Sequence, residues 1–285
     1  MVGWLVINTF MDQVKFINLY EMLSLAFKNR GVSLLTKKAE DISLEVHAEI
    51  KNKPDFVIFW DKDIYLAERL EKQGIRLFNS SSAINLCDNK ILMYQALAAS
   101  HIKIPKTYIA PKTFEGLNYN HRRFINKIIK EIGFPLIVKE AYGSFGEQVY
   151  LAKDKDDLNR IIDGLGYKDF LMQEYIKESK GKDIRINVVG NQVIASMLRS
   201  NEQDFRSNIS SGGHGSKIDP EKDFIDLAVN ATKALGLDFA GVDVLFGKDG
   251  PIICEVNSNP QFGSTLKYTG VNLADYIADY IIKKL

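Results

Sequence analysis

The sequence predicts an α/β fold built in two parts, and three observations support this expectation. In the first part, short apolar runs alternate with helix-like segments, a pattern typical of a parallel sheet with helices on its faces. In the last third, apolar and polar residues alternate along runs joined by turn residues, which favours antiparallel strands. The length of 285 residues corresponds to roughly two domains of about 150 residues each.

The first part is expected to alternate strands and helices. Gly31 and Gly74 each follow a helix-like segment and are read as its C-terminal stop. No G-x-G-x-x-G follows the first strand, so the phosphate loop of a dinucleotide-binding fold is missing. The expected elements are strands at 4–7, 56–60 and 75–78 and helices at 14–30 and 64–73.

The remaining elements follow the same reasoning. Pro105 breaks a helix-rich segment, and Gly190 with Asn191 forms a turn between two alternating runs. A polar, glycine-containing loop is expected at 199–217. The other helices are expected at 82–101, 121–132, 157–165, 224–235 and 273–283, and the strands at 106–109, 135–140, 170–176, 184–188 and 193–198.

A predicted hairpin at 241–257 brings two acidic residues together. Pairing 242 with 256, 244 with 254 and 246 with 252 places six apolar residues on one face: Val242, Val244, Phe246, Ile252, Cys254 and Val256. In that register Asp243 lies opposite Glu255, with Asn257 on the same face. Like charges placed opposite each other are destabilising, so the group requires a cation or a proton. Mg²⁺ prefers such oxygen ligands together with phosphates. The alternative is two acids on a solvated sheet face.

Two further segments carry signals for binding a nucleotide. Lys139 ends an apolar strand and is followed by Gly143-Ser144-Phe145-Gly146, where glycines allow backbone N–H groups to approach an anion. The loop lacks the GK[ST] ending of a Walker motif, and an ordinary flexible turn is the alternative. The strand at 170–176 runs into a polar stretch, so its end can offer free backbone groups to an adenine edge.

Composition excludes several classes of protein. The formal net charge is +1, which argues against a dedicated nucleic-acid-binding protein. Cys87 and Cys254 have no C-x-x-C spacing, and two reduced thiols are expected, with Cys254 a small buried hydrophobe. The N-terminus lacks the features of a signal peptide, and no run approaches the roughly 18 apolar residues of a membrane span. We therefore expect a cytoplasmic protein without a membrane partner.

Together these segments resemble the ATP-grasp superfamily, and most closely its RimK-like branch of α-L-glutamate and related amino-acid ligases. The resemblance covers residues 80–285. It implies a parallel pre-ATP-grasp domain at 1–85 and an ATP-grasp domain at 86–285, with a central lobe at about 103–174 and a C-terminal lobe at about 175–285. The stretches that carry it are Lys90, Lys139 with the loop at 143–146, 173–176, 181–185, 205–208 with Gly212 and Gly213, Asp243, and 255–260 with 269–272.

The resemblance also implies roles for individual residues. ATP would be held at its phosphates by Lys90 and Lys139, under a mobile loop containing Gly143, Ser144 and Gly146. Adenine would be held by Glu174, Tyr175 and Ile176, and ribose by Asp183. Mg²⁺, with Mn²⁺ as an alternative metal, would be bound by Asp243, Glu255 and Asn257.

Catalytic roles are implied for arginine and asparagine side chains. Arg206 and Asn208 would face the substrate carboxylate or the developing oxyanion, with Arg185 and Arg199 as weaker candidates for the same work. The sequence departs from the family after Gly146, where Glu147 and Gln148 stand in place of a further glycine. His214 lies in a glycine-rich stretch and is read as incidental.

The implied activity is an ADP-forming ligase that joins a carboxylate to an amine through an acyl phosphate, with an amino acid such as glutamate as one substrate. The implied partners are ATP, a carboxylate and an amine on an amino acid, peptide or protein tail, and a homo-oligomer is expected by analogy. Two alternatives stay open at this point. One is an ATP-binding regulatory module without ligase turnover, and the other is a ligase for a small metabolite other than glutamate.

Overall fold

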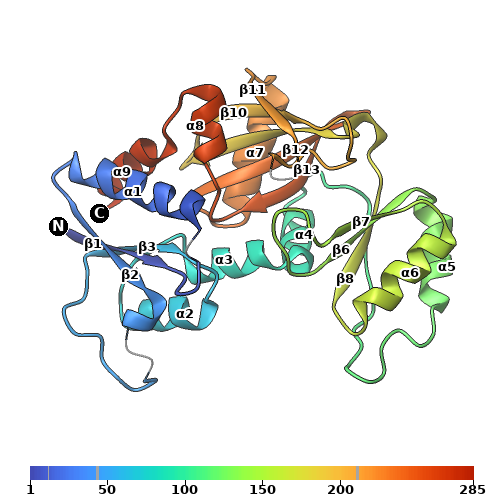
Figure 1. Cartoon of the computed structure of the whole chain (residues 1–285), viewed down its shortest axis with the longest axis horizontal. Helices are drawn as coiled ribbons and strands as arrows, with labels where there is room; N and C mark the ends of the chain where they lie inside the picture. The colour runs from blue at the N-terminus through green and yellow to red at the C-terminus, as the bar shows by residue number, and fades with distance from the viewer. Residues whose placement is uncertain (12, 43–44, 210–211) are drawn as a thin grey trace.

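The computed structural model of the chain describes residues 1–11, 13–42, 45–209 and 212–285. These residues form a four-stranded parallel sheet, followed by a four-stranded and a five-stranded antiparallel sheet (Figure 1). The predicted α/β class, with the parallel sheet first, is confirmed. Within these residues, no helix combines the length and the apolar character needed to cross a lipid bilayer.

The first sheet is parallel: a helix connects its first strand to the second and its third to the fourth, whereas residues 39–55, which include the 3₁₀ turn η1 (Ala39–Asp41), connect the second to the third. The third strand is buried along its whole length, which explains its continuous apolar run. The second strand in chain order was not predicted from the sequence, because it is polar and partly exposed at the edge of the sheet. The strands are β1 (Val2–Ile7), β2 (Ser33–Lys38), β3 (Phe56–Trp60) and β4 (Leu77–Phe78), in the order β2-β1-β3-β4, and the helices are α1 (Val14–Lys28) and α2 (Ile64–Lys72).

The end of the chain completes the core of this first sheet. The last helix, α9 (Leu273–Lys284), packs beside α1, while α2 lies on the opposite face (Figure 1). Ile277 and Ile281 are fully buried in the same apolar cluster as Leu19 and Leu23. The N-terminal sheet is therefore attached to the C-terminal part by a packed helix as well as by the chain itself.

The expected helix at 82–101 is two helices, because Asn89 ends one and caps the next. The side-chain oxygen of Asn89 accepts hydrogen bonds from the N–H groups of Ile91 and Leu92, at 2.9 and 3.2 Å. This cap fixes the start of the second helix at Lys90. The two helices are α3 (Ser81–Asp88) and α4 (Lys90–Ala99), and they link the first sheet to the rest of the molecule.

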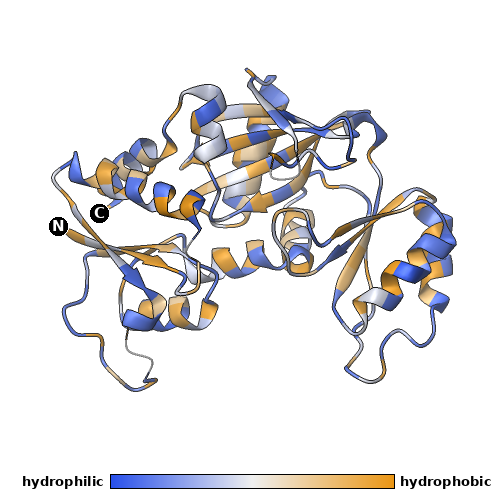
Figure 2. Ribbon diagram, viewed as in Figure 1, coloured by the Kyte–Doolittle hydropathy of each residue, from blue (hydrophilic) through white to orange (hydrophobic). Residues whose placement is uncertain are grey.

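The second sheet carries two helices on its outer side, and Figure 2 shows these helices polar toward solvent and the strands beneath them largely apolar. The short strand β7 was missed, since only one of its residues is buried. The elements are β5 (Thr107–Ile109), α5 (Arg123–Ile132), β6 (Leu136–Glu140), β7 (Val149–Ala152), α6 (Lys155–Leu165) and β8 (Phe170–Glu174), with strand order β5-β8-β6-β7.

The third sheet has the strand order β11-β10-β9-β12-β13. The polar loop expected at 199–217 is shorter, because Arg199 pairs with Gly215 and Ser200 with His214; residues 210–211 of that expectation lie outside the described residues. Short helix α8 was also missed. The elements are the 3₁₀ turn η2 (Lys177–Ser179), β9 (Lys182–Val189), β10 (Gln192–Ser200), β11 (His214–Lys217), α7 (Lys222–Ala234), β12 (Phe239–Gly247), β13 (Gly250–Asn257) and α8 (Gly263–Thr269).

The hairpin of β12 and β13 follows the predicted register only at one end. Val242 pairs with Val256 and Asp243 with Glu255, as expected, but the register then shifts at a β-bulge. The predicted pairs 244–254 and 246–252 are therefore wrong, since Val244 pairs with Ile253. A bulge places one extra residue in one strand, and here it sends the Ile253 side chain into the core.

The same bulge corrects the expectation for Cys254, which is not part of the buried apolar face. Cys254 is only partly buried and lines a cavity together with Glu255. Ile253 takes the place in the apolar core that the sequence reading had given to Cys254.

Candidate active site

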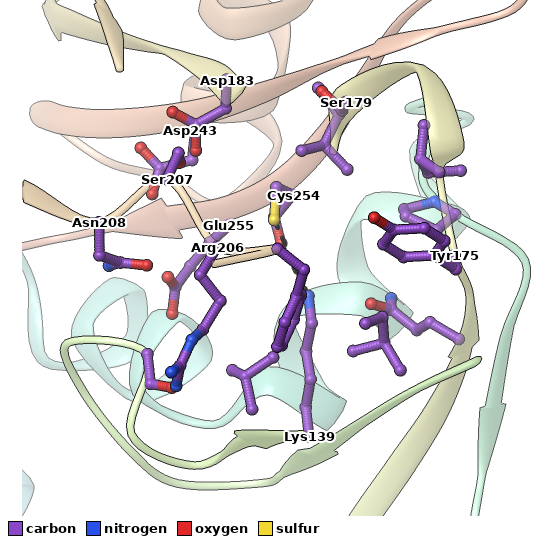
Figure 3. A pocket seen from close by; sticks show the side chains of 18 of the residues that line it. Lys139, Tyr175, Ser179, Asp183, Arg206, Ser207, Asn208, Asp243, Cys254 and Glu255 are labelled. Atoms are coloured by element: carbon purple, nitrogen blue, oxygen red, sulfur yellow. Dashed lines mark hydrogen bonds between the residues drawn. The ribbon is translucent and has the colours of Figure 1, made fainter. Parts of the chain in front are cut away.

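A cavity lies between the second and third sheets and collects most of the residues that the sequence singles out (Figure 3). Four of those residues, namely Gly143, Ser144, Arg185 and Asn257, are not among its lining. The predicted site residues that line it are Lys90, Lys139, Gly146, Glu174, Tyr175, Ile176, Asp183, Arg206, Asn208, Asp243 and Glu255.

Lys139 projects from β6 into this cavity as a buried cation (Figure 3). Its side chain donates a hydrogen bond to the Tyr94 hydroxyl at 2.7 Å, and its Nζ lies 3.9 Å from the sulfur of Cys254. Burial alone would lower the pKa of Lys139, but the neighbouring Cys254 and Tyr94 outweigh it and the pKa lies above its usual value. No described carboxylate forms a salt bridge with it, so this buried charge suits an anionic ligand.

Lys90 connects three parts of the site from the first turn of α4. Its Nζ donates a hydrogen bond to the carbonyl oxygen of Gly143 at 3.0 Å and lies 3.3 Å from Glu255 Oε1. Gly143 therefore contacts the site through its backbone although it does not line the cavity. The Glu255 side chain keeps about 30% of its surface exposed and faces the cavity.

Asp243 lies at the centre of a buried row of alternating charges on neighbouring strands. Arg185, directly opposite on β9, binds both of its carboxylate oxygens, and NH2 of Arg199 lies 2.9 Å from Oδ1. Arg199 also donates from Nε to Asp183 at 2.7 Å. Burial tends to raise the pKa of Asp243, but the two arginines outweigh it and hold that pKa below its usual value. The positive charge that the Asp243–Glu255 pairing requires is thus already supplied in part by arginine.

Oxygen donors for a magnesium ion are still available here. One lone pair of Asp243 Oδ2 is not used by a described donor, and Glu255 accepts a contact at Oε1 only, from Lys90. The Asn257 amide instead donates to the carbonyl oxygen of Gly241 at 3.3 Å. The described residues contain no cluster of three or more His, Cys, Asp or Glu with metal-binding geometry. The donor set fits Mg²⁺ only as a site completed by ligand phosphates and water.

The far end of the cavity is formed where β8 ends. The Glu174 side chain accepts a hydrogen bond from the backbone N–H of Lys106, the residue before β5, at 2.7 Å, so this carboxylate already has a donor. Tyr175 and Ile176 line the cavity, and their N–H groups meet no acceptor among the described residues. Free backbone donors beside apolar side chains can bind the edge of a planar base.

The loop at residues 143–146, here called the glycine loop, joins β6 to β7 and is contacted from both sides. Lys62, just after β3, donates to the Ser144 hydroxyl at 3.2 Å, and Arg206 donates to the carbonyl oxygen of Gly146 at 2.6 Å. The Nζ of Lys15 lies 4.2 Å from the centre of the Phe145 ring. The glycine loop is therefore contacted on one side by residues next to the first sheet, Lys15 and Lys62, and on the other by Arg206 in the loop between β10 and β11.

Several cavity residues were missed by the sequence reading. Arg199 was only a weak candidate, because an arginine in a strand usually lies on the surface. Three further lining residues, Gln173, Lys182 and Ser207, lie inside stretches that carry the family resemblance but were given no role of their own. Ser179 also lines the cavity and lies outside those stretches. His214 does not line it.

Comparison with known proteins identifies the family. The RimK-like ATP-grasp domain matches residues 87–281. A protein of Mycoplasma pneumoniae named MG012 homolog is 40% identical over 78% of each chain. A probable alpha-L-glutamate ligase of Vibrio atlanticus is 36% identical over 76% of this chain and 71% of its own length. Human N-acetylaspartylglutamate synthase A is 37% identical over 79% of this chain but only 57% of its own length.

Solved structures agree in fold. A RimK domain ATP-grasp protein from Sphaerobacter thermophilus superposes with a TM-score of 0.75 at 21% identity, covering 98% of this chain and 99% of its own. D-alanine–D-alanine ligase from Bacillus anthracis, solved in complex with ATP, superposes with a TM-score of 0.74 at 17% identity, covering 99% and 96%. The parallel first sheet, the cavity between two antiparallel sheets and the family match over residues 87–281 together show that this chain belongs to the RimK-like ATP-grasp ligases.

Proposed function

We propose that this protein is an ADP-forming ligase that joins a carboxylate to an amine at the cavity between its second and third sheets. The observation that carries the proposal is the buried ammonium of Lys139, which forms no salt bridge with a described carboxylate, in the same cavity as the acidic side chain of Glu255. A buried ammonium can bind the phosphates of a nucleoside triphosphate, and a carboxylate beside it can bind a metal ion together with those phosphates.

In this proposal the nucleotide lies along the cavity, with its phosphates at one end and its adenine at the other. Lys90 and Lys139 hold its phosphates, and the glycine loop covers them with Gly143, Ser144 and Gly146. Adenine lies at the end of β8 beside Glu174, Tyr175 and Ile176, with Asp183 toward the ribose. Asp183 reaches this position while bound to Arg199, so any ribose contact uses its remaining lone pairs.

Mg²⁺ is the assigned metal, held by Glu255 and Asp243 with Asn257 next to them. The metal supplies charge neutralisation on the phosphoryl groups. The Asn257 amide nitrogen donates to the carbonyl oxygen of Gly241, and Oδ1, the atom that would bind the metal, accepts no hydrogen bond from a described donor. Arg185 holds Asp243 from the opposite strand and so fixes the orientation of that carboxylate.

The reaction is phosphoryl transfer followed by amide formation. A substrate carboxylate oxygen bonds to the terminal phosphorus of ATP and ADP leaves, giving an acyl phosphate. The amine nitrogen then bonds to the acyl carbon, the C–O bond to phosphate breaks, and the amine loses a proton to solvent. Arg206 and Asn208 line the cavity beside Glu255 and stabilise the oxyanion in this second step.

Glutamate is the proposed amino-acid substrate. The similar proteins from Vibrio atlanticus and human carry glutamate in their names, as a ligase and as a synthase of a glutamate-containing product. We further propose that the reaction takes place in the cytoplasm and that the protein assembles with copies of itself.

The deciding experiment measures Mg²⁺-dependent ADP formation with a panel of carboxylates and amino acids, and identifies the amide by mass spectrometry. ADP and an amide that contains glutamate are expected, and both should be lost in Asp243→Ala and Glu255→Ala. ADP formation with a different amino acid would contradict the assignment of glutamate as the substrate but would still support the ligase reaction. Nucleotide binding without ADP formation across the whole panel would favour a regulatory ATP-binding module instead.

A further inference from the structure

The side chain of Arg206 is held in one place by a neighbour that does not itself line the cavity. Its Nε donates to Asp204 Oδ1 at 3.1 Å and its NH2 to Asp204 Oδ2 at 2.7 Å. Its remaining amino group, NH1, donates to the carbonyl oxygen of Gly146 at 2.6 Å. A guanidinium has five N–H bonds, so two of them are left without an acceptor among the described residues.

Asp204 also fixes the backbone from which this side chain extends. Its Oδ1 accepts a hydrogen bond from the backbone N–H of Arg206 at 2.9 Å. The carboxylate thus binds Arg206 at its main chain and along one edge of the guanidinium at the same time. Figure 3 shows the Arg206 side chain extending toward the glycine loop.

We infer that Asp204 is a positioning residue, which aims the two remaining N–H bonds of Arg206 at an anionic oxygen of the reacting phosphoryl or acyl group. The inference rests on the proposed function, because that function places the reacting groups in the cavity that Arg206 lines. Asp204 contacts neither group and acts through Arg206 alone.

The physical reason is the cost of ordering a long side chain. An arginine loses much of its rotamer freedom when it is fixed, and an enzyme benefits when that loss precedes the reaction. A single exposed ion pair would order little, but here two side-chain contacts, one backbone cap and the bond to Gly146 act together. The hydrogen bonds from Arg206 hold the pKa of Asp204 below its usual value, so the carboxylate stays charged at neutral pH.

The test compares Asp204→Asn with Glu202→Gln. Asparagine keeps an oxygen for the backbone cap but loses the charge and one acceptor. Glu202 is an exposed residue two positions away on the same loop, so its variant is matched in place and charge. Nitrogen-15 NMR of the full protein reports the Nε–H of Arg206, and the Arg206→Lys variant assigns that signal by its loss.

The wild type and Glu202→Gln are expected to show a slowly exchanging Nε–H signal for Arg206, and Asp204→Asn is expected to lose it. In ADP formation, kcat should fall about tenfold or more in Asp204→Asn, with the KM for ATP nearly unchanged. Placed in the Arg206→Lys background, Asp204→Asn should cause no further fall.

Three outcomes would overturn the inference. They are a retained Nε–H signal in Asp204→Asn, a kcat equal to that of Glu202→Gln, or an undiminished fall in kcat in the Arg206→Lys background. A wild type that forms no ADP would refute the proposed function instead. The NMR comparison would then still decide whether Asp204 orders Arg206.

Discussion

The guanidinium of Arg199 lies 2.9 Å from the carboxylate of Asp243, on a strand that is not adjacent to that of Asp243. It reaches across β9, where it also binds Asp183 at 2.7 Å. Both carboxylates line the cavity, one at the proposed ribose position and one at the proposed metal position. One buried arginine therefore fixes the orientation of two acids that we assign to different parts of the nucleotide.

Replacement of Arg199 by methionine should destabilise the protein strongly. The change leaves Asp183 buried without its partner and Asp243 with Arg185 alone, and breaking a buried ion pair costs roughly 3–5 kcal/mol. Denaturant unfolding measures the loss. The matched control is Lys222→Met, which removes an exposed pair with Asp226 and should change the free energy of unfolding by less than about 1 kcal/mol. Equal effects of the two variants would show that the buried row contributes nothing to stability.

Replacement of Lys139 by methionine should separate binding from stability. Without this ammonium, the affinity for ATP should fall at least about tenfold, which corresponds to the loss of roughly 1.4 kcal/mol. The free energy of unfolding should fall by only about 1 kcal/mol, because the raised pKa of Lys139 shows that the folded protein favours its charged form and the hydrogen bond to Tyr94 is lost. Calorimetric titration with ATP and denaturant unfolding measure the two quantities. Lys127→Met, at an exposed position of α5, is the control, and an unchanged ATP affinity in Lys139→Met would contradict the phosphate assignment.

Local patterns in the sequence predicted much of the fold and the Asp243–Glu255 pairing. Strand alternation has a period of two, so the apolar residues of the hairpin set the register at its open end. The bulge after Asp243 could not be predicted, because Ile252, Ile253 and Cys254 are all apolar enough to face the core. The partners of Arg199 could not be predicted either, since they depend on the order in which β9, β10 and β12 lie side by side.

Cys254 should react slowly with alkylating reagents at neutral pH. Burial is the main reason that its pKa is raised to about 11, so the reactive thiolate is scarce at pH 7.5. The alkylation rate should therefore rise about tenfold per pH unit up to a pH of about 11, rather than level off near 8.5 as for an ordinary thiol. Mass spectrometry of the modified peptide measures the rate. Because Cys254 lines the cavity, ATP should slow the reaction, and a rate that ignores ATP would place the nucleotide elsewhere.

Gly181 anchors the loop that carries Arg206, and alanine at this position should displace that loop. Gly181 has φ +64°, and an added Cβ would lie 2.1 Å from the carbonyl oxygen of Asn201 and 2.8 Å from that of Asp204. Both are backbone atoms, so the loop itself must move. The free energy of unfolding should fall by the roughly 1 kcal/mol of a strained φ plus about 1–3 kcal/mol for the clash, and ADP formation should fall with it.

Gly31→Ala is the matched control for Gly181→Ala, because Gly31 has φ +73° and no heavy atom within 4 Å of an added Cβ. It carries the backbone strain without the clash and lies outside the cavity lining. Denaturant unfolding and the ADP assay on both variants therefore separate strain from displacement of the loop. Equal losses of stability, with ADP formation intact in both, would show that the contact between Gly181 and Asn201 does not hold Arg206 in place.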